Sequence, residues 1–129
     1  MEEPAPAALA GHRVLVVEDE ALVAMELGDI LERQGCRVIG PAASIAQALA
    51  LLDGRRLDAA LLDLNLNGEP GLPVAVALSG RGVPFVVVSG YAEDQVSAPA
   101  LRGAPRLMKP VRHCELVRVL TQVLTPPSD

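Results

Sequence analysis

The sequence predicts an α/β fold in which a parallel sheet lies between two layers of helices. Short apolar runs, such as residues 14–17 and 59–62, are typical of strands that are covered on both faces. Segments with apolar residues at helical spacing separate these runs, so strands and helices alternate along the chain. The length of 129 residues, 50% of them hydrophobic, fits one domain with a sizeable core and leaves no room for a second.

The first strand, the first helix and the second strand are expected between residues 14 and 39. Residues 14–17 form a strand, and the apolar residues after it recur at helical spacing up to Gly35. The first helix should end there, because glycine adopts the left-handed backbone of a helix end without steric cost. Residues 37–39 then form a short second strand.

The second helix begins at a capping signal. Ser44 followed by Gln47 is a capping box, in which both side chains satisfy free backbone N–H groups at the start of a helix. Gly54 is expected to end this helix. Residues 58–62 form the third strand, and Pro73 fits the first turn of a third helix.

The last third of the chain contains the weakest pattern. Residues 85–88 form the fourth strand. Residues 93–104 have a poor helical pattern that contains Pro99, so the fourth helix is expected to be short or mobile. Residues 106–108 form the fifth strand, and the last helix starts at about Arg112.

Five strand–helix repeats define the topology. Such a chain forms a parallel sheet through right-handed crossovers. Five strands of this length suit a flavodoxin-like, doubly wound sheet with strand order 2-1-3-4-5, which places the ends of strands one and three side by side. This (βα)5 domain is predicted to span residues 12–125, with flexible tails at residues 1–11 and 126–129.

The composition argues against two kinds of partner. A net charge of −5, with Phe85 and Tyr91 as the only aromatic residues, offers neither the field nor the stacking surface that nucleic acids need. No apolar stretch approaches the about 18 residues of a membrane span, and no signal peptide is evident, so a cytoplasmic protein without a membrane partner is expected. Cys36 and Cys114 lack metal-ligand spacing and are expected to pack as small apolar residues.

Three carboxylates follow two of the predicted strands. Glu18 and Asp19 end the first apolar run, and Asp63 ends another. Because the carboxyl ends of parallel strands line one crevice, these side chains should converge on a cation. In an alternative interpretation, Glu18 and Asp19 cap the following helix and Lys109 pairs with Asp63 only structurally. That alternative leaves Ser89 unexplained.

Four motifs at the ends of strands one, three, four and five resemble the receiver domains of two-component response regulators. They are VLVVEDE at residues 14–20, LDLN at 62–65, VSG at 88–90 and KP at 109–110. Residues 63–69 and 84–91 further resemble the FAT GUY subgroup of stand-alone receivers. The chain departs from the Phe-Ala-Thr-Gly-Tyr motif of that subgroup but keeps its hydroxyl, glycine and tyrosine.

The resemblance implies that Asp63 is the phosphoacceptor. It also implies a Mg²⁺ site made of Glu18, Asp19 and Asp63 with the backbone carbonyl of Asn65, where the ion neutralises charge on the phosphoryl oxygens. Three carboxylates against the single positive charge of Lys109 leave the empty pocket at −2, which a divalent cation cancels.

The resemblance assigns the other side of the pocket to phosphoryl binding and switching. Ser89 and Lys109 would each bind one phosphoryl oxygen, and Lys109 would pair with Asp63 before phosphorylation. Gly90 would let the loop move when the Ser89 hydroxyl is drawn toward the phosphoryl group.

Two further positions concern the switch and its output. Pro110 follows Lys109 at a turn where receivers usually have a cis bond, although the sequence alone does not distinguish cis from trans. Many receivers carry a switching aromatic residue three positions before the lysine, where this chain has Arg106. Tyr91 is therefore the remaining candidate for an output reporter.

The expected function is that of a single-domain response regulator, which is not a classical enzyme but assists its own phosphorylation and dephosphorylation. A sensor histidine kinase of the HWE or a related class, or a histidine phosphotransfer protein, would donate the phosphoryl group. The signal would leave through an unknown downstream protein, or the domain would act as a phosphate sink.

The sequence argues against two other functions. One is an unphosphorylated pseudo-receiver acting as a protein-binding module, which should lack Asp63, Lys109 or the acidic pair. The other is a hydrolase of the haloacid-dehalogenase type, which should have an Asp-x-Asp motif on its first strand and a cap domain. The sequence has neither signature.

Overall fold

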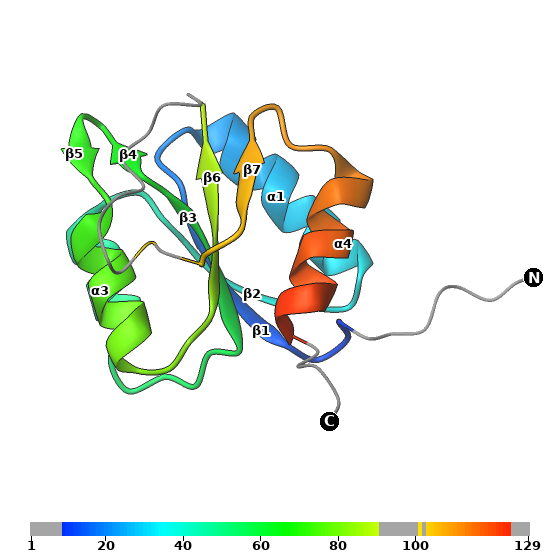
Figure 1. Ribbon diagram of the computed structural model, residues 1–129, viewed down its shortest axis with the longest axis horizontal. Coiled ribbons are helices and arrows are strands. Elements are labelled where there is room, and N and C mark those ends of the chain that lie inside the picture. The colour runs from blue at the N-terminus through cyan, green and yellow to red at the C-terminus, as the bar shows by residue number, and fades with distance from the viewer. Residues whose placement is uncertain (1–8, 91–100, 102, 125–129) are drawn as a thin grey trace, which may run out of the picture.

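Five parallel strands form the central sheet of the protein. The computed structural model describes residues 9–90, 101 and 103–124. The strands of the sheet are β1 (Arg13–Val17), β2 (Arg37–Ala42), β3 (Ala59–Asp63), β6 (Phe85–Ser89) and β7 (Arg106–Met108). They are ordered β2-β1-β3-β6-β7, and every pairing is parallel (Figure 1). The predicted flavodoxin-like order 2-1-3-4-5 is therefore confirmed.

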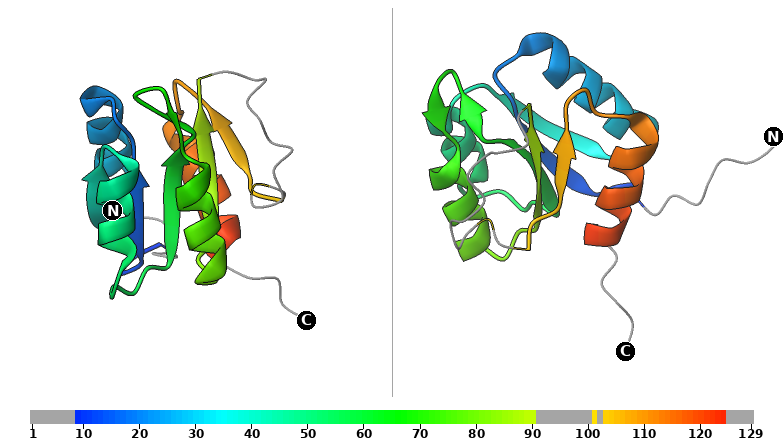
Figure 2. Two further views of the ribbon diagram at one scale, coloured as in Figure 1. Left: turned by 90° about the vertical axis from the view of Figure 1, so that its left-hand side faces the viewer. Right: turned by 45° about the horizontal axis from the view of Figure 1, so that its top comes forward.

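Within the described residues, two helices cover each face of the sheet. On one face lie α1 (Ala21–Arg33) and α4 (His113–Leu124), and on the other lie α2 (Ile45–Leu52) and α3 (Leu72–Gly80) (Figure 1 and Figure 2). Strand side chains alternate between the two cores: Leu15 packs with the α2 and α3 residues, whereas Val14 and Val16 pack with those of α1 and α4. Because both faces are buried, the strands appear in the sequence as continuous apolar runs.

The helix ends follow the predicted signals. The Oγ of Ser44 accepts the N–H of Gln47 at 3.1 Å, which confirms Ser44 as the N-cap. The Oε1 of Gln47 accepts the N–H of Ala43, one residue before the cap, at 2.8 Å, instead of the N–H of Ser44 that a capping box would use. Gly35 and Gly54 follow the ends of α1 and α2 with φ of +83° and +72°. The left-handed backbone at these two positions explains why glycine marks each helix end.

The edges of the fold extend beyond the predicted boundaries. Strand β2 continues three residues past residue 39, because a register shift lets it pair with β1 again at Ala42. The core also begins before residue 12. Leu9 is only 2% exposed and packs in the core of α1 and α4, and its carbonyl accepts a hydrogen bond from the thiol of Cys36 at 3.4 Å. Cys36 is buried as predicted, whereas Cys114 is exposed.

A small hairpin, which the apolar pattern of the sequence does not predict, follows β3. It pairs β4 (Asn65–Leu66) with β5 (Glu69–Pro70) in antiparallel register. The two turn residues, Asn67 and Gly68, have φ of +54° and +85°. Positive φ at both central positions is the geometry that an Asn-Gly pair favours in a two-residue hairpin, so this dipeptide was the available signal.

Some predictions fall outside the described residues. These are most of the fourth helix at residues 93–104, the output candidate Tyr91, and the tails at residues 1–8 and 125–129. In the part of the chain that is described, no helix combines the length and apolar character needed to cross a bilayer.

Gly71 packs directly against the end of β3. An added Cβ at this position would lie 2.7 Å from the carbonyl oxygen of Asp63 and 3.3 Å from the Cα of Leu64. The Gly71 N–H also donates to the carbonyl of Leu64 at 2.8 Å. Both neighbours are backbone, which has little freedom to move, so this close approach requires glycine.

We therefore predict that Gly71→Ala lowers the free energy of unfolding by about 1–3 kcal/mol through overpacking. Urea denaturation measures the change. Gly28→Ala is the matched control, because Gly28 lies inside α1 with nothing within 4 Å of an added Cβ. The control should leave stability unchanged or raise it by up to about 1 kcal/mol. Equal effects of the two substitutions would contradict the packing argument.

Candidate metal site at the carboxyl edge of the sheet

All the buried polar side chains of the described residues gather at one edge of the sheet. Glu18, Asp63 and Ser89 are 2%, 4% and 1% exposed, and no other described polar or charged side chain is buried. Glu18 follows β1, Asp63 ends β3 and Ser89 ends β6. Because the strands are parallel and adjacent, their carboxyl ends meet at the same edge (Figure 1). Burying polar groups is costly, so their concentration here indicates a functional site.

The ammonium group of Lys109 lies at the centre of this edge. Its Nζ is 3.1 Å from the Oδ2 of Asp63, 3.0 and 3.1 Å from the two carboxylate oxygens of Glu18, and 3.3 Å from the Oε1 of Glu20. Lys109 follows β7, the edge strand next to β6, so the contacts join three strands. The contact with Glu20 was missed in the sequence, where the only signal was a third acidic residue after Glu18 and Asp19.

The two oxygens of Glu18 have different surroundings. Oε2 accepts hydrogen bonds from Lys109 Nζ and from the N–H of Glu20, both at 3.1 Å. Oε1 is buried and 3.0 Å from the same ammonium, but the angle does not allow a hydrogen bond. Burial raises the pKa of Glu18 to about 7, against the opposing effects of the Lys109 hydrogen bond and the Glu20 N–H.

The pKa of Lys109 moves in the direction that its partners dictate. Burial alone would lower it, but the hydrogen bonds and negative charges of Glu18 and Asp63 outweigh burial, and the net pKa is raised. Lys109 therefore remains protonated, and its positive charge stays in the cluster at neutral pH.

The acidic side chains fit a hard divalent cation. Glu18, Asp19 and Asp63 each offer an oxygen atom, and these atoms lie within 4.8 Å of one another. Carboxylate oxygens are the ligands that Mg²⁺ prefers. The buried Oε1 of Glu18 forms an ion pair with Lys109 at 3.0 Å without meeting the criteria of a hydrogen bond, so a lone pair of this oxygen remains for a cation.

The hairpin presents its backbone to this cluster. The Asn65 N–H donates to the Oδ1 of Asp63 at 3.0 Å, and the Asn67 N–H donates to the Oδ2 of Asp19 at 2.9 Å. Asn65 lies opposite Pro70 in the hairpin, and the hydrogen bond next to this pair joins the N–H of Gly71 to the carbonyl of Leu64. Asn65 and Pro70 are therefore a non-hydrogen-bonded pair, and the N–H and C=O of Asn65 point away from β5. Its carbonyl thus lies on the side of the strand where its N–H contacts Asp63, which suits the predicted ligand.

A cleft of about 420 Å³ opens above these groups. Its lining residues are Asp19, Glu20, Asp63, Asn65, Asn67, Gly68, Gly90 and Lys109. The hairpin forms one wall, while the ends of β6 and β7 form the other. The cleft is large enough for a phosphate-sized group beside Asp63.

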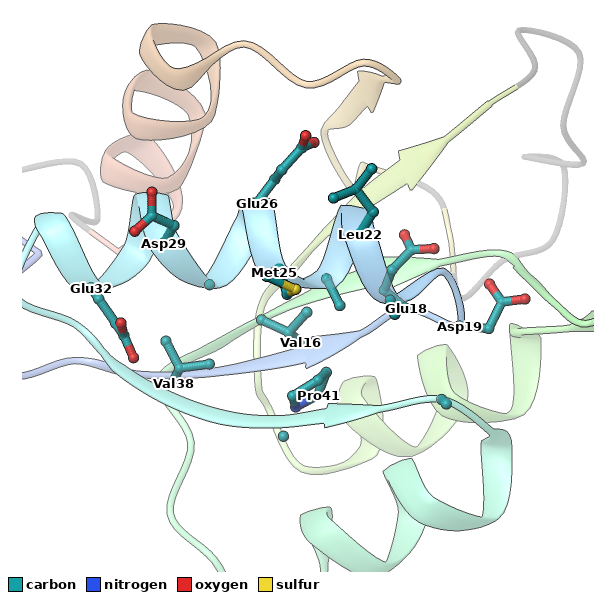
Figure 3. A pocket seen from close by; sticks show the side chains of 15 residues that line it. Val16, Glu18, Asp19, Leu22, Met25, Glu26, Asp29, Glu32, Val38 and Pro41 are labelled. Atoms are coloured by element: carbon teal, nitrogen blue, oxygen red, sulfur yellow. The ribbon is translucent and has the colours of Figure 1, made fainter.

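A larger hollow of about 700 Å³ runs along α1 and β2 (Figure 3). Leu22 and Met25 border it and are 68% and 69% exposed. It shares Asp19 with the cleft but has neither Asp63 nor Lys109 in its lining. We therefore assign the chemistry to the smaller cleft.

The remaining predicted residues lie as follows. Ser89 ends β6, one residue beyond the Val88 that pairs with Asp63, and its carbonyl accepts the Lys109 N–H at 2.8 Å. Gly90 lines the cleft, and the Lys109–Pro110 bond is cis, as the resemblance implied. Glu20, the N-cap residue of α1, makes no side-chain cap hydrogen bond, but Glu18 accepts the N–H of Glu20 at 3.1 Å and so contacts the start of this helix as well as Lys109.

A doubly wound parallel sheet with three carboxylates, a hydroxyl and a lysine at its carboxyl edge defines a receiver-type α/β domain. Residues 14–121 match the response regulator receiver domain family. The chain belongs to that family.

Individual relatives agree with this assignment. The positive alginate biosynthesis regulatory protein of Pseudomonas aeruginosa is 35% identical over 88% of this chain and 47% of its own length. The solution structure of SdrG from Sphingomonas melonis Fr1 is 39% identical, with a TM-score of 0.77 over 92% of this chain and 98% of that chain. The chain spans about half the length of the curated relatives it matches.

A second solved structure contains a metal ion in such a site. The receiver domain of the sensor histidine kinase PA1611 from Pseudomonas aeruginosa PAO1 was solved with a magnesium ion coordinated in its active site cleft. It is 27% identical, with a TM-score of 0.78 over 91% of this chain and the whole of that chain. Its bound ion is consistent with the acidic cluster of Glu18, Asp19 and Asp63.

The raised pKa of Glu18 predicts a dependence of stability on pH. In the folded protein Glu18 holds a proton up to about pH 7, whereas its ordinary pKa is 4.5. The folded state therefore binds more protons between these values, and the contribution of Glu18 to stability falls as pH rises through this window. Between pH 4.5 and pH 7, the free energy of unfolding of the wild type should fall by on the order of 1–3 kcal/mol relative to that of Glu18→Gln. Urea denaturation in EDTA at several pH values measures this difference, and a constant difference would contradict it.

Proposed function

We propose that this receiver domain accepts a phosphoryl group on Asp63 in a Mg²⁺-dependent reaction. A histidine kinase or a histidine phosphotransfer protein is the donor. The observation that carries the proposal is the contact of Asp63 with Lys109 at 3.1 Å, in a cleft where two further carboxylates lie within metal-binding distance. A purely structural ion pair would not require the additional buried carboxylate of Glu18.

The metal site consists of the oxygens of Glu18, Asp19 and Asp63, with the Asn65 carbonyl. A bound Mg²⁺ supplies positive charge that neutralises the phosphoryl oxygens during transfer. The magnesium ion coordinated in the active site cleft of the related PA1611 receiver domain supports a magnesium site in this cleft. The assignment leaves Lys109 as the positive side chain that the described residues place in the cleft beside the phosphoryl group.

Phosphoryl transfer forms one bond and breaks one. A carboxylate oxygen of Asp63 attacks phosphorus, and the bond from phosphorus to the donor histidine nitrogen breaks, with the electron pair returning to the imidazole. Lys109 keeps its proton and binds a phosphoryl oxygen, and the Ser89 hydroxyl donates to another. Gly90 gives the loop after Ser89 the backbone freedom to follow that hydroxyl.

The domain acts as a switch rather than as a classical enzyme. Phosphorylation adds negative charge at one edge of the sheet, and movement of Ser89 and Lys109 transmits that change to the loops after β6 and β7. The output is contact with a downstream protein or withdrawal of phosphoryl groups from the kinase. The FAT GUY subgroup, and with it an HWE-class kinase partner, remains a prediction from residues 63–69 and 84–91.

We predict that Asp63→Asn abolishes phosphoryl uptake, because the amide is not a nucleophile. Intact mass after incubation with acetyl phosphate and Mg²⁺ measures uptake. The matched control is Asp53→Asn, which removes an exposed carboxylate in contact with Arg81 and should leave uptake unchanged. Uptake by Asp63→Asn at the wild-type rate would refute the acceptor assignment. No uptake by the wild type, even with candidate kinases, would favour the pseudo-receiver.

We also predict that Lys109→Ala retains Mg²⁺ binding, since none of the proposed ligands is lost and a competing cation is removed. Asp19→Asn, in contrast, should weaken binding about tenfold or more, because it removes a charged ligand. Calorimetric titration with Mg²⁺ measures both variants. If Lys109→Ala lost affinity as severely as Asp19→Asn, the lysine would instead organise the metal site.

A further inference from the structure

Glu20 differs from the other two carboxylates that bind Lys109. The ammonium donates hydrogen bonds to Glu18, Asp63 and Glu20. Glu18 and Asp63 belong to the acidic group that converges for a metal, whereas Glu20 does not. A cation on that group engages two of the three acceptors of Lys109 and also repels the ammonium. Glu20 is the acceptor that remains.

The position of Glu20 suits this remaining contact. Its side chain is 62% exposed, against 1% for Glu18 and 5% for Asp63, so its carboxylate lies at the mouth of the cleft. Its backbone is fixed, because its N–H donates to the Oε2 of Glu18 and its carbonyl accepts the N–H of Ala24 in α1. The fixed backbone and long side chain of Glu20 hold its carboxylate at the mouth of the cleft, within 3.3 Å of the Lys109 ammonium.

We propose that Glu20 is a positioning residue for Lys109, which it retains at the mouth of the cleft once a divalent cation has engaged Glu18 and Asp63. This inference rests on the proposed function. When a phosphoryl group reaches Asp63, the ammonium passes from Glu20 to a phosphoryl oxygen and keeps its proton throughout. An ammonium that is already held at the cleft loses less freedom on reaching the transition state than one that moves in solvent.

Lys109 is the only lysine of the chain, which gives this proposal a direct spectroscopic test. Protein labelled with ¹⁵N-lysine gives one side-chain ammonium signal, and its exchange with water is measured by NMR with and without Mg²⁺. In the wild type with Mg²⁺ the signal should remain protected from exchange. Glu20→Gln and Glu20→Asp should both lose this protection, the first through loss of charge and the second through a shorter reach. Equal protection in all three proteins would overturn the proposal.

The matched control is Glu26→Gln. Glu26 lies on α1, the helix whose N-cap residue is Glu20, and its substitution removes the same charge. Glu26 makes no described hydrogen bond or ion pair with Lys109, although both residues line one pocket. Protection of the ammonium should therefore survive this substitution. Loss of protection in Glu26→Gln would show that the general field of α1, and not the Glu20 contact, retains Lys109.

Rates of phosphorylation by acetyl phosphate with saturating Mg²⁺ give the second readout. Both Glu20 variants should slow uptake by about two- to fivefold, the range expected for an exposed ion pair. The effect should vanish in a Lys109→Ala background, because Glu20 acts through the lysine. A purely electrostatic role predicts the opposite pattern, with Glu20→Gln faster and Glu20→Asp unchanged, and would overturn the proposal.

The two readouts separate this inference from the proposed function. If the wild type takes up no phosphoryl group, the proposed function fails, and the ammonium signal still tests the contact of Glu20 with Lys109. If uptake occurs and neither Glu20 variant alters rate or protection, the function stands and the positioning role is wrong.

Discussion

The cluster of Lys109 with Glu18 and Asp63 is the interaction on which the rest of this edge depends. Both carboxylates are almost fully buried at the ends of adjacent strands, where two negative charges without a counter-charge would be unstable. Lys109 supplies that charge from β7, two strands away from β3. The site therefore requires this strand order, because it brings together the ends of β1, β3 and β7, which are far apart in the sequence. The ammonium of Lys109 then lies 3.0 Å from Glu18 and 3.1 Å from Asp63.

The same cluster explains how the site can exist with one cation or with two. Without a metal, the lysine is the compensating charge that the described residues supply, and the raised pKa of Glu18 lets that group hold a proton to reduce the remaining repulsion. A divalent cation in the acidic group supplies the charge that the lysine supplied before. The lysine then becomes available for another anion, so the order of binding follows from charge balance.

The three central strands β1, β3 and β6 could be predicted because each is an almost fully buried apolar run. The strand order followed from the flavodoxin-like arrangement that suits five parallel strands joined by helices. The convergence of the three carboxylates Glu18, Asp19 and Asp63 followed from the same argument, since the carboxyl ends of adjacent parallel strands meet at one edge. Apolar periodicity does not indicate the hairpin, because its strands have two residues each and its signal is the Asn67–Gly68 turn. Leu9 was missed because a single apolar residue in an Ala- and Pro-rich segment has no period. The contact of Glu20 depends on the conformation of a long side chain, which spacing does not determine.

The hairpin shows why side-chain identity says little about this part of the site. Its contacts with the acidic group are made by the backbone N–H groups of Asn65 and Asn67, and the Asn65 side chain instead accepts the N–H of Gly68 at 2.8 Å within the turn. Gly71 then lets the returning strand pass against the carbonyl of Asp63. The turn geometry thus fixes Asp19 and Asp63 relative to each other. A sequence that keeps the positive-φ residues of the turn and the glycine at position 71 therefore preserves the backbone contacts of the hairpin with Asp19 and Asp63, whatever side chains the hairpin presents to the cleft.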